Sequence, residues 1–102
     1  MTGEAMPSPV EVRQALTAVI DPELGLNIVD LGLVYDVEVE DRTIVVRYTL
    51  TTMGCGLGPV IAGQMTEVLA TFPASDVRTE LTFRPPWSAD LISSEGKAFL
   101  GI

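Results

Sequence analysis

Apolar residues near the start of the chain recur with helical spacing. The predicted helix would carry one apolar stripe, which consists of Val12, Leu16, Val19 and Ile20. Ser8 and Glu11 have the spacing of a capping box, and Pro9 suits the first helical position. Pro22 disfavours helical geometry in the residue before it. We therefore expect a first helix that begins after Ser8 and stops at Asp21.

Further along, apolar and polar residues alternate strictly, which predicts two strands joined by a turn at Asp41-Arg42. The first strand begins at Leu33, and the second runs from Thr43 to Thr51. The side chains expected to face the core are Leu33, Tyr35, Val37 and Val39 in the first strand and Ile44, Val46, Tyr48 and Leu50 in the second. On the wet face, Arg47 is expected to lie across from an acidic residue.

The second half predicts a helix, a strand and a short terminal helix. The helix stripe is Ile61, Met65, Val68, Leu69 and Phe72, and the strand Val77 to Phe83 would turn Val77, Leu81 and Phe83 inward. Ser88 is expected to cap the terminal helix. The order α-β-β-α-β-α predicts a small α+β single domain, 1–102, with a three-stranded mixed sheet and helices packed on one face. Residues 1–7 are expected to form a flexible leader.

Composition then excludes several classes of function. Among 102 residues there are 14 acidic and 6 basic side chains, which give a net charge of -8, so a surface that tracks phosphates is not expected and nucleic acid is excluded as a partner. One cysteine and no histidine exclude an internal disulfide and zinc sites that need imidazole. No signal-peptide pattern or long apolar run is present, so we expect a cytoplasmic protein without a membrane partner.

Three segments are poorly explained by core packing: 21–23, 51–55 and 85–90. All three lie at the ends of predicted elements, where loops gather into clefts. Cys55 lies before the second helix between two glycines. Backbone amides there would favour its thiolate form, which is the reactive and metal-binding form. The alternative is that Cys55 is a small buried apolar residue.

The other candidate residues each have two interpretations. Asp21 and Glu23 are either a carboxylate pair or metal ligands, or else Asp21 caps a turn and Glu23 is solvated. Thr51 and Thr52 offer hydroxyl groups beside the thiol, although threonine is common in strands. Trp87, with Asp90 after it, either faces a partner or covers the small core.

The same segments carry a resemblance to a known family. Residues 21–34 read DPELGLNIVDLGLV, residues 51–55 read TTMGC and residues 85–90 read PPWSAD. In this order they resemble the metal-sulfur cluster biosynthetic proteins, which include PaaD-like and SufT-like proteins and the cytosolic iron-sulfur targeting factors. The resemblance implies an α+β fold, a role in assembling or inserting iron-sulfur clusters, and a shared pocket of Asp21, Glu23, Thr51, Thr52 and Cys55. Gly56 stands where the family usually has proline, which puts the start of the second helix in doubt.

Chemistry limits how such a cluster is held. Iron-sulfur clusters normally take four thiolates, and this chain has one cysteine. A cluster or iron would therefore be shared across a homodimer, completed by other ligands, or held transiently by Cys55 while a client apoprotein or another assembly factor supplies the rest. The leading hypothesis is an accessory factor in iron-sulfur maturation with Cys55 as transient metal or sulfur ligand. An adaptor that recruits clients without metal and a cysteine-dependent enzyme are the alternatives.

Overall fold

The computed structural model describes residues 6–51 and 58–102. The elements follow the order α1 (Pro9–Leu16), β1 (Val34–Glu40), β2 (Thr43–Tyr48), α2 (Gly58–Leu69), β3 (Asp76–Leu81), a 3-10 turn (Ala89–Leu91) and α3 (Ser94–Leu100). The predicted α+β order is confirmed. The described part of the expected leader, Met6 and Pro7, packs on the domain, since Pro7 is buried and Met6 contacts the core.

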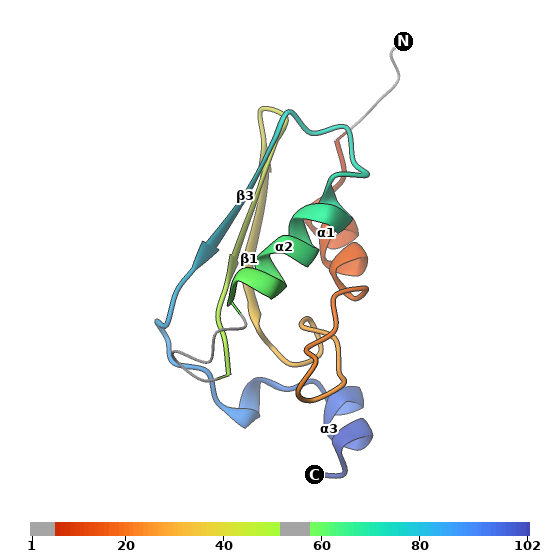
Figure 1. Ribbon diagram of the computed structural model, residues 1–102, viewed down its shortest axis with the longest axis vertical. Coiled ribbons are helices and arrows are strands. Elements are labelled where there is room, and N and C mark those ends of the chain that lie inside the picture. Colours follow the sequence, from red (N-terminus) through yellow and green to blue (C-terminus); the bar gives the residue numbers. More distant parts are fainter. Residues whose placement is uncertain (1–5, 52–57) are drawn as a thin grey trace.

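The sheet is mixed, as predicted, with strand order β1-β2-β3. β1 and β2 pair antiparallel, whereas β2 and β3 run parallel because α2 carries the chain back between them. Helices α1 and α2 cover one face of the sheet, while α3 lies beyond its end (Figure 1). No helix in the described ranges is long and apolar enough to cross a membrane.

The β1-β2 hairpin follows its sequence pattern closely. Asp41 and Arg42 both have positive φ angles, 49° and 63°, as the tight turn between twisted strands requires. On the open face Arg47 lies 3.2 Å from Asp36 and 3.2 Å from Glu80, so the predicted cross-strand pairing is confirmed and reaches both neighbouring strands. This face is charged and solvated, and the opposite face carries the core.

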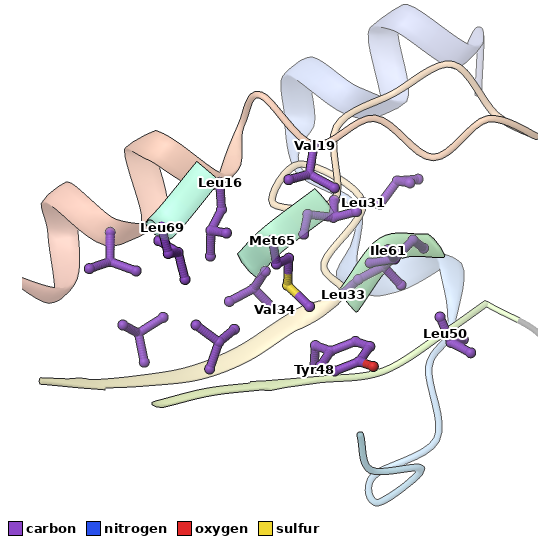
Figure 2. Close-up of a cluster of buried hydrophobic side chains, with 14 of the residues drawn as sticks. Leu16, Val19, Leu31, Leu33, Val34, Tyr48, Leu50, Ile61, Met65 and Leu69 are labelled. Atoms are coloured by element: carbon purple, nitrogen blue, oxygen red, sulfur yellow. The ribbon is translucent and has the colours of Figure 1, made fainter. Parts of the chain in front are cut away.

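The core lies between the sheet and the two covering helices. Leu16 comes from α1, Ile61, Met65 and Leu69 come from α2, and Tyr48 and Leu50 come from β2 and its continuation (Figure 2). All of these side chains are buried. The loop between α1 and β1 adds Ile28, Leu31 and Leu33, each fully buried, so much of the core comes from a segment without regular periodicity.

The first helix is shorter than predicted. Its start is confirmed, because Ser8 and Glu11 form the capping box through bonds of 3.2 and 2.9 Å. Its end at Asp21 is wrong, because α1 stops at Leu16 and a turn follows. Val19 is still fully buried there, and its carbonyl accepts a bond from the Ile28 amide. Ile20, which was predicted on the same apolar stripe, is instead 42% exposed, because the helix has already ended and the chain folds back on itself.

Two strand residues that were predicted to face the core lie elsewhere. A bulge between Val34 and Asp36 shifts the register of β1, so Val34 is buried in the place predicted for Tyr35. The Tyr35 hydroxyl instead donates to the Pro85 carbonyl at 2.8 Å. Leu81 is 45% exposed because it ends β3 at the edge of the sheet. β2 also ends earlier than predicted, at Tyr48.

The C-terminal helix begins later than predicted. Ser88 makes no side-chain cap, and α3 starts at Ser94 with Ser93 as N-cap, whose hydroxyl accepts from the Gly96 amide at 3.0 Å. Gly96 is buried, and a Cβ there would lie 2.9 Å from the Leu26 side chain and 3.1 Å from the Asp30 carbonyl oxygen. The glycine thus lets α3 pack directly against the loop that precedes β1.

Candidate functional site

A cleft opens where the three segments singled out in the sequence meet. Its described lining consists of Glu23, Leu24, Thr51 and Trp87, and its volume is about 340 Å³. Glu23 and Leu24 come from the loop after α1, Thr51 follows β2, and Trp87 follows β3. Described residues of all three segments are therefore neighbours in space, although 64 positions of sequence separate Glu23 from Trp87.

Asp21 shapes the loop that presents Glu23. Its side chain is 2% exposed, and its Oδ1 atom accepts from the Glu23 amide at 2.8 Å and the Leu24 amide at 3.3 Å. The backbone closes the same turn, since the Gly25 amide donates to the Asp21 carbonyl at 2.8 Å. Asp21 is therefore the cap of a turn, and its oxygen atoms are directed at the amides of its own loop.

Glu23 has the opposite environment. It is exposed at the cleft, and no hydrogen bond or ion pair of its side chain occurs within the described ranges. Leu24 beside it is 38% exposed, although it is a large apolar residue. The tip of the loop thus places one exposed carboxylate and one apolar side chain at the cleft.

Trp87 forms the opposite wall and is held from two sides. Its indole Nε1 donates to the Leu31 carbonyl at 2.7 Å, and its ring packs partly against the core. Two residues earlier, the Pro85 carbonyl accepts from the Tyr35 hydroxyl. Of the two interpretations of Trp87, the contacts agree with a cover for the core. The half-buried ring also lines the cleft, and its role as a partner-facing aromatic stays a prediction.

The remaining predicted site residues are distributed differently. Thr51 is half-buried in the lining of the cleft. Thr52 and Cys55 lie outside the described residues. Asp90 is exposed in the 3-10 turn and does not belong to the described lining. The structure therefore brings Glu23, Thr51 and Trp87 together, while Asp21 lies behind them as support.

A polar network that the sequence did not predict connects the loop before β1 to the start of α3. The Asn27 amide donates to Asp30 Oδ2 at 2.7 Å, and the Ser93 hydroxyl donates to Asp30 Oδ1 at 2.9 Å. The Ser93 backbone amide also donates to the Asp30 carbonyl at 2.7 Å. These bonds tie α3 to the loop before β1. The Asn-x-x-Asp spacing followed by a glycine was the available signal, because such side chains commonly bond to nearby backbone.

Two polar groups of β2 and its continuation are buried near the cleft. Burial raises the pKa of Tyr48 above its usual value, so the phenol stays neutral at physiological pH. The hydroxyl of Thr49 is fully buried and has no hydrogen-bond partner among residues 6–51 and 58–102. Among the described residues no three acidic or cysteine side chains gather closely enough to enclose a metal ion. In the described part of the cleft, the side-chain oxygen atoms that could bind a metal ion are therefore those of Glu23 and Thr51.

Two relatives that align with most of this chain are named Fe-S protein maturation auxiliary factors. The chain is 46% identical over 93 residues to the Fe-S protein maturation auxiliary factor YitW of Bacillus subtilis, with 89% of this chain and 91% of that protein covered. It is 48% identical over 86 residues to the Fe-S protein maturation auxiliary factor SufT of Staphylococcus aureus, with 82% and 98% covered. A solved structure from Bacillus anthracis, described as a domain of unknown function, matches with a TM-score of 0.88 at 37% identity over 92% of both chains.

The family model described as iron-sulfur cluster assembly protein matches residues 9–79. That range runs from the first residue of α1 into β3, and it contains the loop that carries Asp21 and Glu23 as well as Thr51. The segment with Trp87 and α3 lies after it. On the strength of this match and of two relatives that align over most of their length, the chain belongs to the family of iron-sulfur cluster assembly proteins.

Proposed function

We propose that the protein is an accessory factor that helps to assemble iron-sulfur clusters or to insert them into client apoproteins, and that the cleft is its working surface. The observation that carries the proposal is the meeting of Glu23, Thr51 and Trp87 in one cleft of a chain from this family. Relatives that align over most of their length are themselves named Fe-S protein maturation auxiliary factors, which supports the accessory role.

Cys55 is proposed as the transient ligand of the iron or cluster that the protein handles. It is the one thiol of the chain, and it follows Thr51 by four residues in a glycine-rich segment. Thiolates are the protein ligands that iron-sulfur clusters normally use. Glu23 supplies an exposed carboxylate in the cleft that Thr51 also lines, and oxygen ligands hold iron in such clusters less firmly than thiolates do. A site of this kind releases its cargo readily, as transfer requires.

The cargo must be completed by ligands from outside the chain. With one cysteine and no histidine, a single copy lacks the four thiolates of an ordinary cluster site. We propose that the client apoprotein or another assembly factor supplies the missing ligands during transfer, in the cytoplasm. A homodimer that shares one cluster between two copies is the other arrangement that meets the same ligand count.

The decisive experiment replaces Cys55 by serine. We expect Cys55→Ser to lower the cluster content and activity of client enzymes in cells, because serine keeps the size of the side chain but removes the thiolate. Anaerobic reconstitution of the purified protein with iron, sulfide and glutathione, a small thiol that supplies the missing ligands, followed by desalting, should give visible charge-transfer absorption in the wild type and none in Cys55→Ser. Unchanged client maturation with Cys55→Ser would refute the ligand role.

One observation favours an adaptor as a second candidate function. Leu24 is 38% exposed and lines the cleft together with Trp87, so the cleft has an apolar rim that suits a protein partner. An adaptor requires Trp87 but not the thiol. Loss of client maturation with Trp87→Ala, together with full activity of Cys55→Ser, would favour the adaptor. Loss of client maturation in both variants would instead favour Cys55 as a ligand of the cargo, with the client bound at the cleft during transfer.

A further inference from the structure

The two edge strands of the sheet, β1 and β3, differ in how their outer backbone groups are covered. At the β1 edge the Arg13 guanidinium donates to the Val34 carbonyl at 3.2 Å and the Tyr35 carbonyl at 3.5 Å, and the bulge lies at the same place. Side-chain caps and bulges are common ways to prevent an edge strand from pairing with another chain. β1 is thus protected at its first two residues, where the bulge lies.

β3 has no such protection within the described ranges. It pairs with β2 on one side, and no strand follows on the other. The Thr82 amide donates to the Tyr48 carbonyl at 2.8 Å, which fixes the even-numbered residues of β3 as those that face β2. Since successive residues of a strand point their amides to opposite sides, Val77, Thr79 and Leu81 direct theirs toward the open edge.

The side chains along this edge are complementary to a second copy of themselves. In antiparallel pairing, only residues whose amides face the open edge can exchange both hydrogen bonds, so an odd-numbered residue must lie opposite an odd-numbered one. With Thr79 opposite Thr79 of the partner subunit, Arg78 lies opposite Glu80 of the partner subunit. In the same register the exposed Leu81 lies opposite Val77 of the partner subunit.

The neighbouring registers are less favourable. A shift by two residues in one direction places Arg78 opposite its own copy, and the same shift in the other direction places Glu80 opposite its own copy. Like charges directly opposite each other across strands are destabilising, whereas opposite charges and apolar pairs contribute favourably. Of these three registers, charge selects the one that is centred on Thr79.

We propose that a second copy of this chain pairs antiparallel with β3, with Thr79 on the two-fold axis. The result is a continuous sheet of six strands, three from each copy. The pairing satisfies three edge amides per copy and covers Leu81, which is otherwise 45% exposed. It does not depend on the proposed function.

This dimer has a consequence for the cleft that does rest on the proposed function. Thr79 pairs with Val46, and Thr51 lies five residues beyond Val46, which corresponds to about 16 Å along an extended strand. Because the two copies run in opposite directions, their clefts lie at opposite ends of the joined sheet, roughly 30 Å apart. Each cleft would then serve one cargo, and the missing ligands would come from the client.

Charge reversal tests the pairing in the full chain. We expect sedimentation equilibrium of the wild type to show a reversible dimer between micromolar and millimolar concentration. Arg78→Glu alone and Glu80→Arg alone place like charges opposite each other twice per dimer and should each raise the dissociation constant about tenfold or more. The double variant Arg78→Glu with Glu80→Arg restores opposite charges and should restore dimerisation.

A second variant removes the pairing amide itself. Thr79→Pro deletes an N–H that points away from β2, a position at which proline is tolerated on edge strands, so the fold should persist while the dimer is lost. Thermal unfolding followed by circular dichroism checks the fold, and Thr79→Ala is the matched control that should remain dimeric. A wild type that stays monomeric throughout, or a dimer that single charge reversals leave unchanged, overturns the proposal. Neither result bears on client maturation, which Cys55→Ser tests separately.

Discussion

Asp21 and Glu23 stand two residues apart in one motif, yet the structure uses them in opposite ways. Asp21 is buried and accepts hydrogen bonds from the amides of its own loop, whereas Glu23 is exposed at the cleft. The same division runs through the whole region. A framework of Asp21, Asn27, Asp30, Gly32 and Ser93 holds the loops, and a cleft face of Glu23, Thr51 and Trp87 lines the open side.

A single family motif thus contains both framework residues and cleft-face residues, and the sequence alone does not distinguish them. Substitutions in the framework should lower the free energy of unfolding. Client maturation should then fall only in proportion to the loss of folded protein. Substitutions on the cleft face should leave the free energy of unfolding nearly unchanged while function falls. The following variants test that contrast, in order of decreasing effect on stability.

Gly32→Ala should be the most destabilising. Gly32 has a φ of 76°, and a Cβ there would lie 2.3 Å from the Leu91 carbonyl oxygen. The 3-10 turn must therefore move away from the loop before β1. Gly25→Ala is the matched control, because Gly25 has a φ of 72° but no atom within 4 Å of its Cβ position. Urea unfolding should show Gly32→Ala to be less stable than Gly25→Ala by about 1 to 3 kcal/mol, the usual cost of overpacking.

The comparison between the two glycines isolates the docking of the C-terminal segment. Both variants carry the same strain from an L side chain at positive φ, so that contribution cancels. Equal stability of the two variants would mean that the contact between Leu91 and Gly32 is not maintained in solution. The framework would then end before the C-terminal segment.

Asp21→Ala should have the next largest effect. It removes the acceptor for the Glu23 and Leu24 amides, and leaving part-buried donors unpaired costs about 1 to 3 kcal/mol. Asp21→Asn keeps an acceptor oxygen of the same reach and should recover most of that loss. Thermal unfolding of both variants checks the prediction. If Asp21→Asn lowered client maturation while unfolding like the wild type, the Asp21 carboxylate would belong to the cleft face instead.

How far the sequence predicts this molecule depends on where its periodicity is regular. The hairpin alternation predicts β1 and β2 and their charged face because one side of that sheet is solvated. The segment between Val19 and Leu33 has no period, although several of its apolar residues are fully buried. Its structure depends on contacts with α3 and the 3-10 turn some 60 residues away. A local sequence pattern does not predict such distant contacts.

The candidate site was predictable in part for the same reason. Its segments stand out because turn formers and polar residues interrupt the apolar pattern, and their convergence follows from the parallel β2 and β3, which end on the same side. The roles within each segment do not follow. Asp21 and Glu23 are alike as residue types, and only the closed turn shows which carboxylate is directed inward.

Ser93→Ala should have a smaller effect that is confined to one end of the molecule. It removes the N-cap of α3 and the bond to Asp30, and loss of such a cap typically costs about 1 kcal/mol. We expect faster hydrogen exchange in α3 amides and little change in β1 to β3. Ser94→Ala is the matched control, because Ser94 is an exposed first helical residue. A uniform rise in exchange across the sheet would show that α3 and the sheet unfold as one unit.

Glu23→Gln should have the smallest effect on stability and the clearest effect on function. The Glu23 side chain is exposed, so its replacement by the isosteric amide should change the free energy of unfolding by no more than about 0.5 kcal/mol. The change removes the negative charge from the cleft while keeping its shape, so cluster-dependent activity of a client should fall. Glu95→Gln, at an exposed carboxylate in the first turn of α3, is the control that should leave maturation unchanged. If both variants matured clients equally well, the Glu23 carboxylate would have no role in handling cargo. Asp21 and Glu23 would then differ only in how deeply their side chains are buried.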